Sequence, residues 1–274
     1  MSRPGWLEVR QGQAPLIVSI PHAGTELRGY EARFVSPWRA RRDADWHMPQ
    51  LYDFAGSLGA TIVRTEISRS IVDVNRNADG VSLYPGQATT ELCPTTTFDG
   101  EPLYREGESP DEAEIAERCA HYYAPYHEAL KREIARLRRT HARVALYDAH
   151  SIRSVIPRLF PGELPVFNLG TNSGRSCSPT LRERLAAALA ASGQSFVVDG
   201  RFKGGWITRD FGRPEAGVEA VQLELACRAY MDEPRTPTPD EANWPGPIDG
   251  ARAGPTRETL RGLIATLLDW GRTG

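Results

Sequence analysis

Cysteine is scarce in this chain of 274 residues, which holds only Cys93, Cys119, Cys177 and Cys227. They are far apart in the sequence and form no Cys-x-x-Cys pair, which excludes a disulfide-stapled framework and a cysteine-rich zinc finger. We expect all of them to be free thiols in or near the core.

Long hydrophobic runs and an excess of charge are missing as well. No apolar stretch approaches the roughly 18–20 residues that cross a bilayer, and Met1 to Trp6 lack the apolar core of a signal peptide. The 33 basic and 35 acidic side chains leave a net charge of −2, which excludes a nucleic-acid binder that works through bulk charge. We therefore expect a cytoplasmic protein without a membrane or nucleic-acid partner, and the oligomeric state stays open.

The composition is that of an ordinary globular protein, with 40% hydrophobic and 25% charged residues. The length suits one α/β unit, so we predict a single domain over residues 1–274.

Strand and helix patterns alternate along the chain. Short β-branched runs predict buried strands at residues 15–20, 60–63, 144–147, 195–198 and 221–225. Helical spacing of apolar residues predicts helices at 111–140, kinked or divided at Pro125, and at 180–192 and 256–270. This alternation indicates a sheet with helices on both faces.

Two long stretches lack such patterns. Residues 84–107 are rich in Gly, Pro and Thr, and residues 233–254 are rich in Pro. Long irregular segments inside a domain are commonly lids, substrate loops or linkers. We expect the first to be an active-site loop and the second a surface connector.

Two histidines stand at the ends of predicted strands. His22 follows the first strand and His150 ends the third. Open α/β sheets bind ligands at the carboxyl ends of their strands, so these two imidazoles can converge on one metal ion. We expect His121, His127 and His141 to be structural or surface residues.

A catalytic zinc commonly takes two His ligands and one carboxylate. The candidates for the carboxylate are Glu26, Asp43 and Asp45. Their spacing does not decide among them.

Other residues carry chemistry suited to an acidic substrate. Arg69, Asn75 and Arg76 lie in one strand-like stretch, and guanidinium groups bind a carboxylate through two parallel hydrogen bonds. Glu224 lies in an apolar run, and burial there would raise the pKa of its carboxyl towards that of a general base. The alternatives are a surface Arg pair and a buried Glu with a structural partner.

Short motifs follow one another in a characteristic order along the chain. They are Pro21-His22-Ala23-Gly24, Asp45-Trp46, Arg69 with Asp73-Val74-Asn75-Arg76, Leu83-Tyr84-Pro85-Gly86-Gln87, Asp148-Ala149-His150-Ser151-Ile152-Arg153-Ser154, Asn168-Leu169-Gly170-Thr171, Gly200-Arg201-Phe202-Lys203-Gly204-Gly205 and Gln222-Leu223-Glu224. Through this set the chain resembles the N-formylglutamate deformylase (N-formylglutamate amidohydrolase) family nearly end to end.

The family is similar in architecture to zinc carboxypeptidases and aspartoacylase. The resemblance therefore implies a zinc-carboxypeptidase-like (phosphorylase/hydrolase-like) fold, a three-layer α/β/α arrangement with a mixed central sheet. It implies one Zn²⁺ held by His22, Asp45 and His150, with Glu26 as the fallback ligand, and Glu224 as base and proton shuttle.

The resemblance also implies that Asn75 and Arg76, helped by Arg69, hold the substrate carboxylates. Asp148 is expected to orient a metal ligand by a hydrogen bond. The chain departs from the related patterns in three places: Thr25 stands where zinc carboxypeptidases have Glu, and Asp210 and Glu219 stand where this family usually has His.

The implied activity is zinc-dependent cleavage of the formyl amide of N-formyl-L-glutamate to formate and L-glutamate, in histidine degradation. Two alternatives stay open. One is a metal-dependent amidohydrolase for another N-acyl amino acid or a small peptide, and the other is a non-catalytic relative that binds an acidic ligand.

Overall fold

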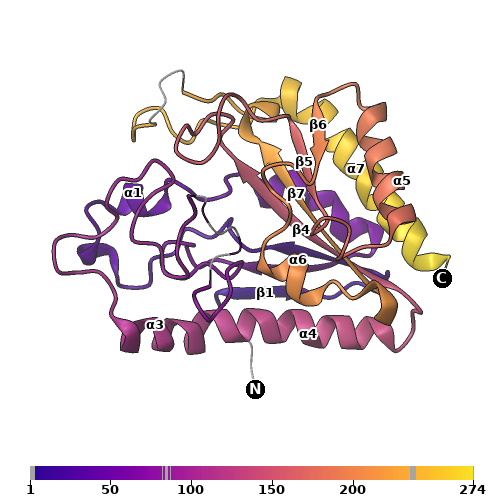
Figure 1. The fold of residues 1–274 in the computed structure, drawn as a ribbon, viewed down its shortest axis with the longest axis horizontal. Helices are drawn as coiled ribbons and strands as arrows, with labels where there is room; N and C mark the ends of the chain where they lie inside the picture. Colours follow the sequence, from indigo (N-terminus) through magenta and orange to yellow (C-terminus); the bar gives the residue numbers. More distant parts are fainter. Residues whose placement is uncertain (1–3, 82, 84–85, 87, 235–238, 274) are drawn as a thin grey trace.

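A mixed seven-stranded sheet forms the centre of the part of the chain that the computed structural model describes, residues 4–81, 83, 86, 88–234 and 239–273 (Figure 1). Its strands are β1 (Leu7–Arg10), β2 (Leu16–Ile20), β3 (Thr61–Thr65), β4 (Val144–Ile152), β5 (Phe167–Gly170), β6 (Phe196–Val198) and β7 (Val218–Ala226). They lie in the order β1-β3-β2-β4-β7-β5-β6. The central strands β3, β2, β4 and β7 are parallel, whereas β1 pairs antiparallel with β3 and β5 antiparallel with β7.

Helices cover both faces of this sheet (Figure 1). Packed on one face are α4 (Ala124–Arg138), which follows α3 (Glu112–Arg118), and α6 (Trp206–Phe211). Packed on the other are α2 (Met48–Leu51), α5 (Pro179–Ala191) and α7 (Gly250–Arg272), while α1 (Pro37–Arg41) lies in the long connection from β2 to β3. The predicted three-layer α/β/α fold with a mixed sheet is confirmed.

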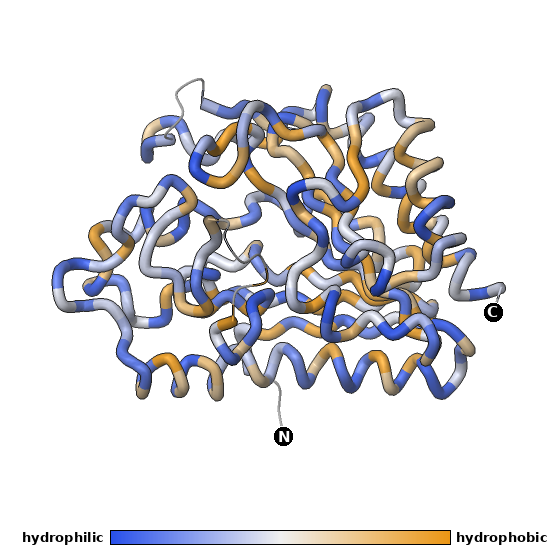
Figure 2. The backbone as a smooth tube through the Cα atoms, viewed as in Figure 1, coloured by the Kyte–Doolittle hydropathy of each residue, from blue (hydrophilic) through white to orange (hydrophobic). Residues whose placement is uncertain are grey.

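Alternation of side chains along the central strands decides which residues share one face of the sheet. Every second residue of β4 and β7 packs beneath α5 and α7, and the residues between them face α4 and α6. On the α4 side, the apolar row of β4 gives way to Asp148 and His150, and the row of β7 to Gln222 and Glu224. The register pairs His150 with Glu224 and Asp148 with Gln222, so the fold sets these polar groups side by side at one end of this face of the sheet. Figure 2 shows the hydrophobic segments gathered on the strands and alternating along the helices.

Every predicted strand is present, with different ends. β4 continues to Ile152 and β7 begins at Val218. The polar residues in these extensions have partners, since Asp148 accepts from the hydroxyl of Ser19 and Glu219 from the backbone N–H of Ser178. The sequence patterns missed β1 and β5, which have 4 residues each, because β1 contains the charged Glu8 and Arg10 and β5 the turn-favouring Asn168 and Gly170. They also missed the short helix α6.

The helix predicted over 111–140 is divided next to Pro125, as expected. A π-helical turn, Cys119–Tyr123, separates α3 from α4, because proline has no N–H to continue the ordinary bonding. α5 matches its prediction closely. α7 begins at Gly250, ahead of the predicted 256, because the Asp249 carboxylate caps it by accepting from the backbone N–H of Ala251 at 2.9 Å.

The prediction of a surface connector at 233–254 is wrong in part. Trp244 is only 3% exposed, and its indole N–H donates to the carbonyl of Arg42 at 2.8 Å. The carbonyl of Trp244 accepts from the indole of Trp38 at 2.9 Å. One large aromatic side chain therefore binds this proline-rich stretch to the core, although residues 235–238 lie outside the described part.

The thiols of Cys93, Cys119, Cys177 and Cys227 are free, and all but Cys119 are buried, which confirms the expectation from their spacing. Among the described helices, none has both the length and the apolar character that a membrane span requires.

The packing of α7 against the sheet makes a stability prediction. Leu263 is fully buried in the core beneath this helix, so Leu263→Ala should lower the free energy of unfolding by about 2–5 kcal/mol through lost burial and a residual cavity. Urea unfolding followed by circular dichroism measures this. Glu258→Ala, on the exposed side of the same helix, should change the value by about 0.5 kcal/mol or less; equal losses in both variants would contradict the assigned core.

Candidate metal centre and active site

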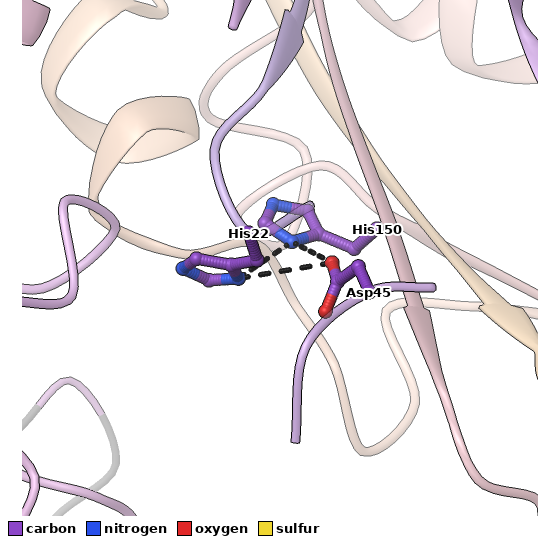
Figure 3. Close-up of side chains that lie close together, drawn as sticks. All are labelled: His22, Asp45 and His150. Carbon is purple, nitrogen blue, oxygen red and sulfur yellow. Dashed lines mark hydrogen bonds and ion pairs between the residues drawn. The ribbon is translucent and has the colours of Figure 1, made fainter. Parts of the chain in front are cut away.

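Three separate parts of the chain bring His22, Asp45 and His150 together (Figure 3). His22 follows β2 after Pro21, His150 belongs to the last part of β4, and Asp45 lies in the turn between α1 and α2. The backbone N–H of Asp45 donates to the carbonyl of His22 at 2.9 Å, which fixes the turn against the end of β2. All three side chains are almost completely buried.

The atoms that face one another are two ring nitrogens and a carboxylate oxygen. His22 Nδ1 lies 3.1 Å from His150 Nδ1, and Asp45 Oδ2 lies 3.1 Å from His150 Nδ1 and 3.8 Å from His22 Nδ1. Zinc–ligand bonds of about 2 Å place ligand atoms at such separations around one ion. The set of two imidazoles and one carboxylate is also the donor set of many catalytic zinc sites.

The opposite nitrogen of each ring is held by a second carboxylate. His22 Nε2 lies 2.7 Å from Asp73 Oδ1, and His150 Nε2 lies 2.8 Å from Asp148 Oδ2. A proton on Nε2 that is donated to a carboxylate leaves the Nδ1 lone pair for a metal and fixes the ring orientation. The residues present therefore fit a divalent metal ion.

The other acids considered from the sequence lie away from this group. Glu26 is exposed and forms a parallel bridge with Ile67. Asp43 accepts a 2.6 Å hydrogen bond from the backbone N–H of Phe98, and burial raises the pKa of its carboxyl. Of the three candidates, only Asp45 has its carboxylate beside both rings.

Burial and neighbouring charges act differently on the two rings. Burial lowers the pKa of His22. Burial also works to lower the pKa of His150, but the charges of Asp148 and Asp45 and their hydrogen bonds outweigh it and raise that pKa well above its ordinary value. Burial works to raise the pKa of Asp45, but the hydrogen bond with His150 and the surrounding positive charge lower it, so the Asp45 carboxyl is ionised.

Asp73 connects the metal centre to the arginines. Its Oδ2 accepts from Arg69 at 2.7 Å and lies 3.8 Å from Arg76, and its Oδ1 accepts from the backbone N–H of Asn75 at 2.9 Å. Burial opposes ionisation, yet the positive charges around this carboxylate hold its pKa well below its usual value. The ionised Asp73 carboxylate thus orients the His22 ring and holds the Asp73-Val74-Asn75-Arg76 segment in a fixed conformation.

Asn75 is engaged at both ends of its side-chain amide. Its Nδ2 donates to Asp148 Oδ2 at 3.0 Å and lies 2.9 Å from His150 Nε2, while its Oδ1 accepts from the backbone N–H of Ile207 at 2.8 Å. The resemblance places Asn75 on a substrate carboxylate. In this structure it joins the β4 site residues to the first turn of α6.

Glu224 lies on β7 beside His150. Burial raises the pKa of its carboxyl to about 7. The side-chain amide of Gln222 donates to Glu224 Oε2 at 3.1 Å and accepts from the backbone N–H of Gly205 at 2.7 Å. The carboxyl of Glu224, the predicted general base, is therefore buried, oriented and able to take up a proton near neutral pH.

A pocket opens beside these groups. It is lined by His22, Arg69, Asn75, Arg76, Ala88, Thr89, Thr90, Phe98, His150, Ile152, Leu159, Arg201, Phe202, Gly205, Gln222 and Glu224. The lining confirms that the described part of 84–107 contributes to the site, through residues 88–90 and Phe98; Tyr84, Pro85 and Gln87 lie outside the described residues. The guanidinium groups line the same space as the imidazoles and Glu224, so the pocket suits a small anion.

The structure also shows residues that reasoning from the sequence did not assign. Arg201 lines the pocket, and Asp73 and Gln222 position other site residues. Each lies inside a motif quoted above, but side-chain contacts between distant segments cannot be read from a motif. Among the other histidines, His127 is buried and bonded to the carbonyl of Val74 at 2.8 Å, in agreement with a structural role.

The departures from the family pattern do not line this pocket. Glu219 accepts from the backbone N–H of Ser178 at 2.6 Å and from the indole of Trp270 at 3.2 Å, near the opposite end of β7 from Glu224. Asp210 lines a separate groove with Tyr123 and other residues. Neither acid is placed to contact a ligand of the pocket.

Comparisons with known proteins agree on one family. A model of the N-formylglutamate amidohydrolase family matches residues 14–231. N-formylglutamate deformylase of Pseudomonas aeruginosa is 49% identical over 268 residues, 97% of each chain. The protein of the same name from Pseudomonas putida is 48% identical over 269 residues, 97% of this chain and 96% of that protein.

Two solved structures share the fold. The crystal structure of N-formylglutamate amidohydrolase from Ralstonia eutropha JMP134 has a TM-score of 0.81 at 23% identity and covers 98% of both chains. That of gene product Atu2144 from Agrobacterium tumefaciens has a TM-score of 0.68 at 16% identity, with 96% of this chain and 94% of that chain covered. At these identities the likeness supports the α/β architecture alone.

The metal centre makes a direct prediction. Purified protein loaded with Zn²⁺ should hold about one ion per chain, because the group offers one set of converging ligands. Asp45→Asn removes the anionic ligand and should weaken zinc affinity by more than the roughly 10–100-fold expected for losing an outer partner such as Asp148. Competition with a chelating dye measures this affinity, and Glu26→Gln, an exposed acid, should leave it unchanged; a zinc loss in Glu26→Gln instead of Asp45→Asn would refute the assignment.

Proposed function

Since this chain belongs to the N-formylglutamate amidohydrolase family, we propose that it is a zinc-dependent amidohydrolase that cleaves N-formyl-L-glutamate to formate and L-glutamate. The names of relatives that are 49% and 48% identical over nearly the whole chain support the substrate. Degradation of histidine to glutamate is the pathway that this product suggests, and the cytoplasm is the proposed location.

One observation carries the proposal. His22 Nδ1, His150 Nδ1 and Asp45 Oδ2 converge to within 3.1–3.8 Å of one another, and both imidazoles line a pocket that Glu224 also lines. A group that can hold a metal ion and a carboxyl with a raised pKa are the parts that metal-assisted hydrolysis of an amide uses.

A Zn²⁺ ion held by these three side chains would supply Lewis-acid chemistry, lowering the pKa of water towards about 7 and polarising the formyl carbonyl. Glu224 accepts the proton of the attacking water, since its own pKa of about 7 suits a base at neutral pH. As the carbon–nitrogen bond breaks, Glu224 returns that proton to the amide nitrogen, which leaves as the amino group of glutamate. Gln222 keeps the carboxyl oriented through its hydrogen bond to Oε2.

The arginines account for recognition of an acidic substrate. Arg76 donates from Nε to the carbonyl of Thr90 at 2.9 Å and from one terminal nitrogen to the Thr90 hydroxyl at 3.0 Å, which fixes its guanidinium plane in the pocket wall. We propose that Arg76 binds the α-carboxylate. Arg69, bonded to Asp73, adds positive potential and keeps the Asp73 carboxyl ionised. Asn75 joins the segment that carries these residues, 69–76, to His150.

Substrate preference tests the proposal. The zinc-loaded protein should hydrolyse N-formyl-L-glutamate with a kcat/KM at least roughly 10-fold above its values for N-acetyl-L-glutamate and N-acetyl-L-aspartate, because one extra methyl group in a fitted pocket costs roughly 10–200-fold. Formate release, measured with a formate dehydrogenase assay, and glutamate release should agree. Faster turnover of an acetyl compound would favour an amidohydrolase for another N-acyl amino acid, and metal binding without turnover of any of the three would favour a binding protein.

Glu224→Gln tests the assigned base. The amide keeps the shape of the side chain but cannot accept the proton, so kcat should fall by about 10²–10⁴ while zinc content and substrate affinity stay near those of the wild type. Glu219→Gln, on the same strand but outside the pocket, should retain activity per folded molecule. Wild-type kcat in Glu224→Gln would mean that another group moves the proton.

A further inference from the structure

We propose that Tyr123 is a positioning residue for substrate recognition, because from the π-helical turn it holds the backbone of Arg76 and so sets where the Arg76 guanidinium group meets the α-carboxylate. The inference rests on the proposed function, which assigns that carboxylate to Arg76. The phenol of Tyr123 donates to the carbonyl of Arg76 at 2.9 Å. The side chain is buried, and burial raises the pKa of its phenol, which therefore stays a proton donor at neutral pH. We call residues 69–76, which include Arg76, the recognition segment.

The π-helical turn, Cys119–Tyr123, gives Tyr123 its direction. α3, this turn and α4 follow one another along one side of the molecule (Figure 1). Residues of an α-helix are about 100° apart around its axis, so residues five apart point about 140° away from each other. In a π-helical turn the bonds join residues i and i+5, and here the N–H of Ala124 donates to the carbonyl of Cys119. The extra residue in this turn brings Arg118 and Tyr123 to the same side of the helical rod.

That side faces the recognition segment. Arg118 donates to the carbonyl of Ile71 at 3.0 Å. His127, one helical turn after Tyr123, has its Nε2 atom 2.8 Å from the carbonyl of Val74, and because a carbonyl can only accept, this nitrogen carries the proton. The rings of Tyr123 and His127 stack with 4.2 Å between their centroids. The π-helical turn therefore lets one rod of helix bond to the recognition segment at several points.

The bond from Tyr123 is the one that reaches Arg76 itself. The carbonyl of Asn75, the residue before, accepts from the backbone N–H of Trp206 at the start of α6 at 3.2 Å. The far end of the Arg76 side chain is bonded to the carbonyl and hydroxyl of Thr90. The arginine is thus held at its base by Tyr123 and at its tip by Thr90, and both points are needed to define the place of the guanidinium group.

Loss of the bond at the base should affect binding more than chemistry. A guanidinium group binds a carboxylate through two parallel hydrogen bonds, and this geometry tolerates little displacement. The metal-ligating group and Glu224 are held by other contacts, on β4, on β7 and in the turn after α1. A displaced Arg76 should therefore raise KM and leave kcat nearly unchanged.

The experiment measures kcat and KM of the zinc-loaded protein for N-formyl-L-glutamate. Tyr123→Phe keeps the ring and its stack on His127 but removes the donor, so KM should rise about 3–10-fold, as expected for one neutral hydrogen bond, while kcat stays within about 2-fold of the wild type. KM does not depend on the fraction of folded or metal-loaded protein. Tyr122→Phe, a matched control on the same turn whose ring packs against Trp6, should leave both constants unchanged.

A double-mutant cycle with Arg76→Met separates a positioning role from a merely structural one. Arg76→Met alone should raise KM roughly 10–100-fold, as expected for a lost hydrogen bond to a charged group. In that background Tyr123→Phe should raise KM by less than about 2-fold more, because the group that Tyr123 positions is gone.

The possible results lead to different conclusions. An equal rise of KM in both backgrounds, an unchanged KM in Tyr123→Phe, or a fall in kcat alone would overturn the role of Tyr123 while the proposed function stands. An unchanged KM in Arg76→Met would overturn the assignment of the α-carboxylate together with this inference. A wild type that does not hydrolyse N-formyl-L-glutamate would overturn the proposed function itself.

Discussion

The constraint on which this structure depends is the close approach of three electron-pair donors, His22 Nδ1, His150 Nδ1 and Asp45 Oδ2, inside the protein. Buried lone pairs that face one another repel unless a proton or a metal ion lies between them, so the three side chains have to be held in place by other residues. Asp73 and Asp148 do this by bonding to the far nitrogen of each ring. A divalent ion would bind all three lone pairs at once, in place of the hydrogen bond between His150 and Asp45, which couples the stability of the site to its chemistry.

The supporting partners extend through the fold in two directions. Asp148 also accepts from the hydroxyl of Ser19 on β2 at 2.8 Å, and that hydroxyl lies 2.9 Å from Tyr126 on α4. On the other side, the amide of Asn75 connects His150 to the beginning of α6. The helices on this face therefore do more than cover apolar surface, since α4 and α6 help to hold Asp148 and Asn75 at fixed places.

Much of the architecture could be predicted from the sequence because strands such as Leu16–Ile20 and helices such as Pro179–Ala191 have strong local patterns. His22 and His150 could be proposed as partners because strand ends meet at one edge of an open sheet. The sequence could not decide among Glu26, Asp43 and Asp45, because that choice depends on how the turn after α1 packs against the end of β2. The positions of Arg201 in the pocket wall and of Asp73 beside His22 escaped notice for the same reason, because both depend on contacts with segments far away in the chain.

The pairing of His150 with Glu224 across β4 and β7 limits how this protein can vary. Side chains of a strand alternate between faces, so inserting or deleting one residue upstream within either strand would turn Glu224 and His150 to opposite sides of the sheet. Differences in length among related proteins should thus accumulate in the connections between elements. The strands β4 and β7 should keep a constant number of residues ahead of His150 and Glu224. An ancestral reconstruction or a loop-grafting design would treat β4 and β7 as one inseparable unit.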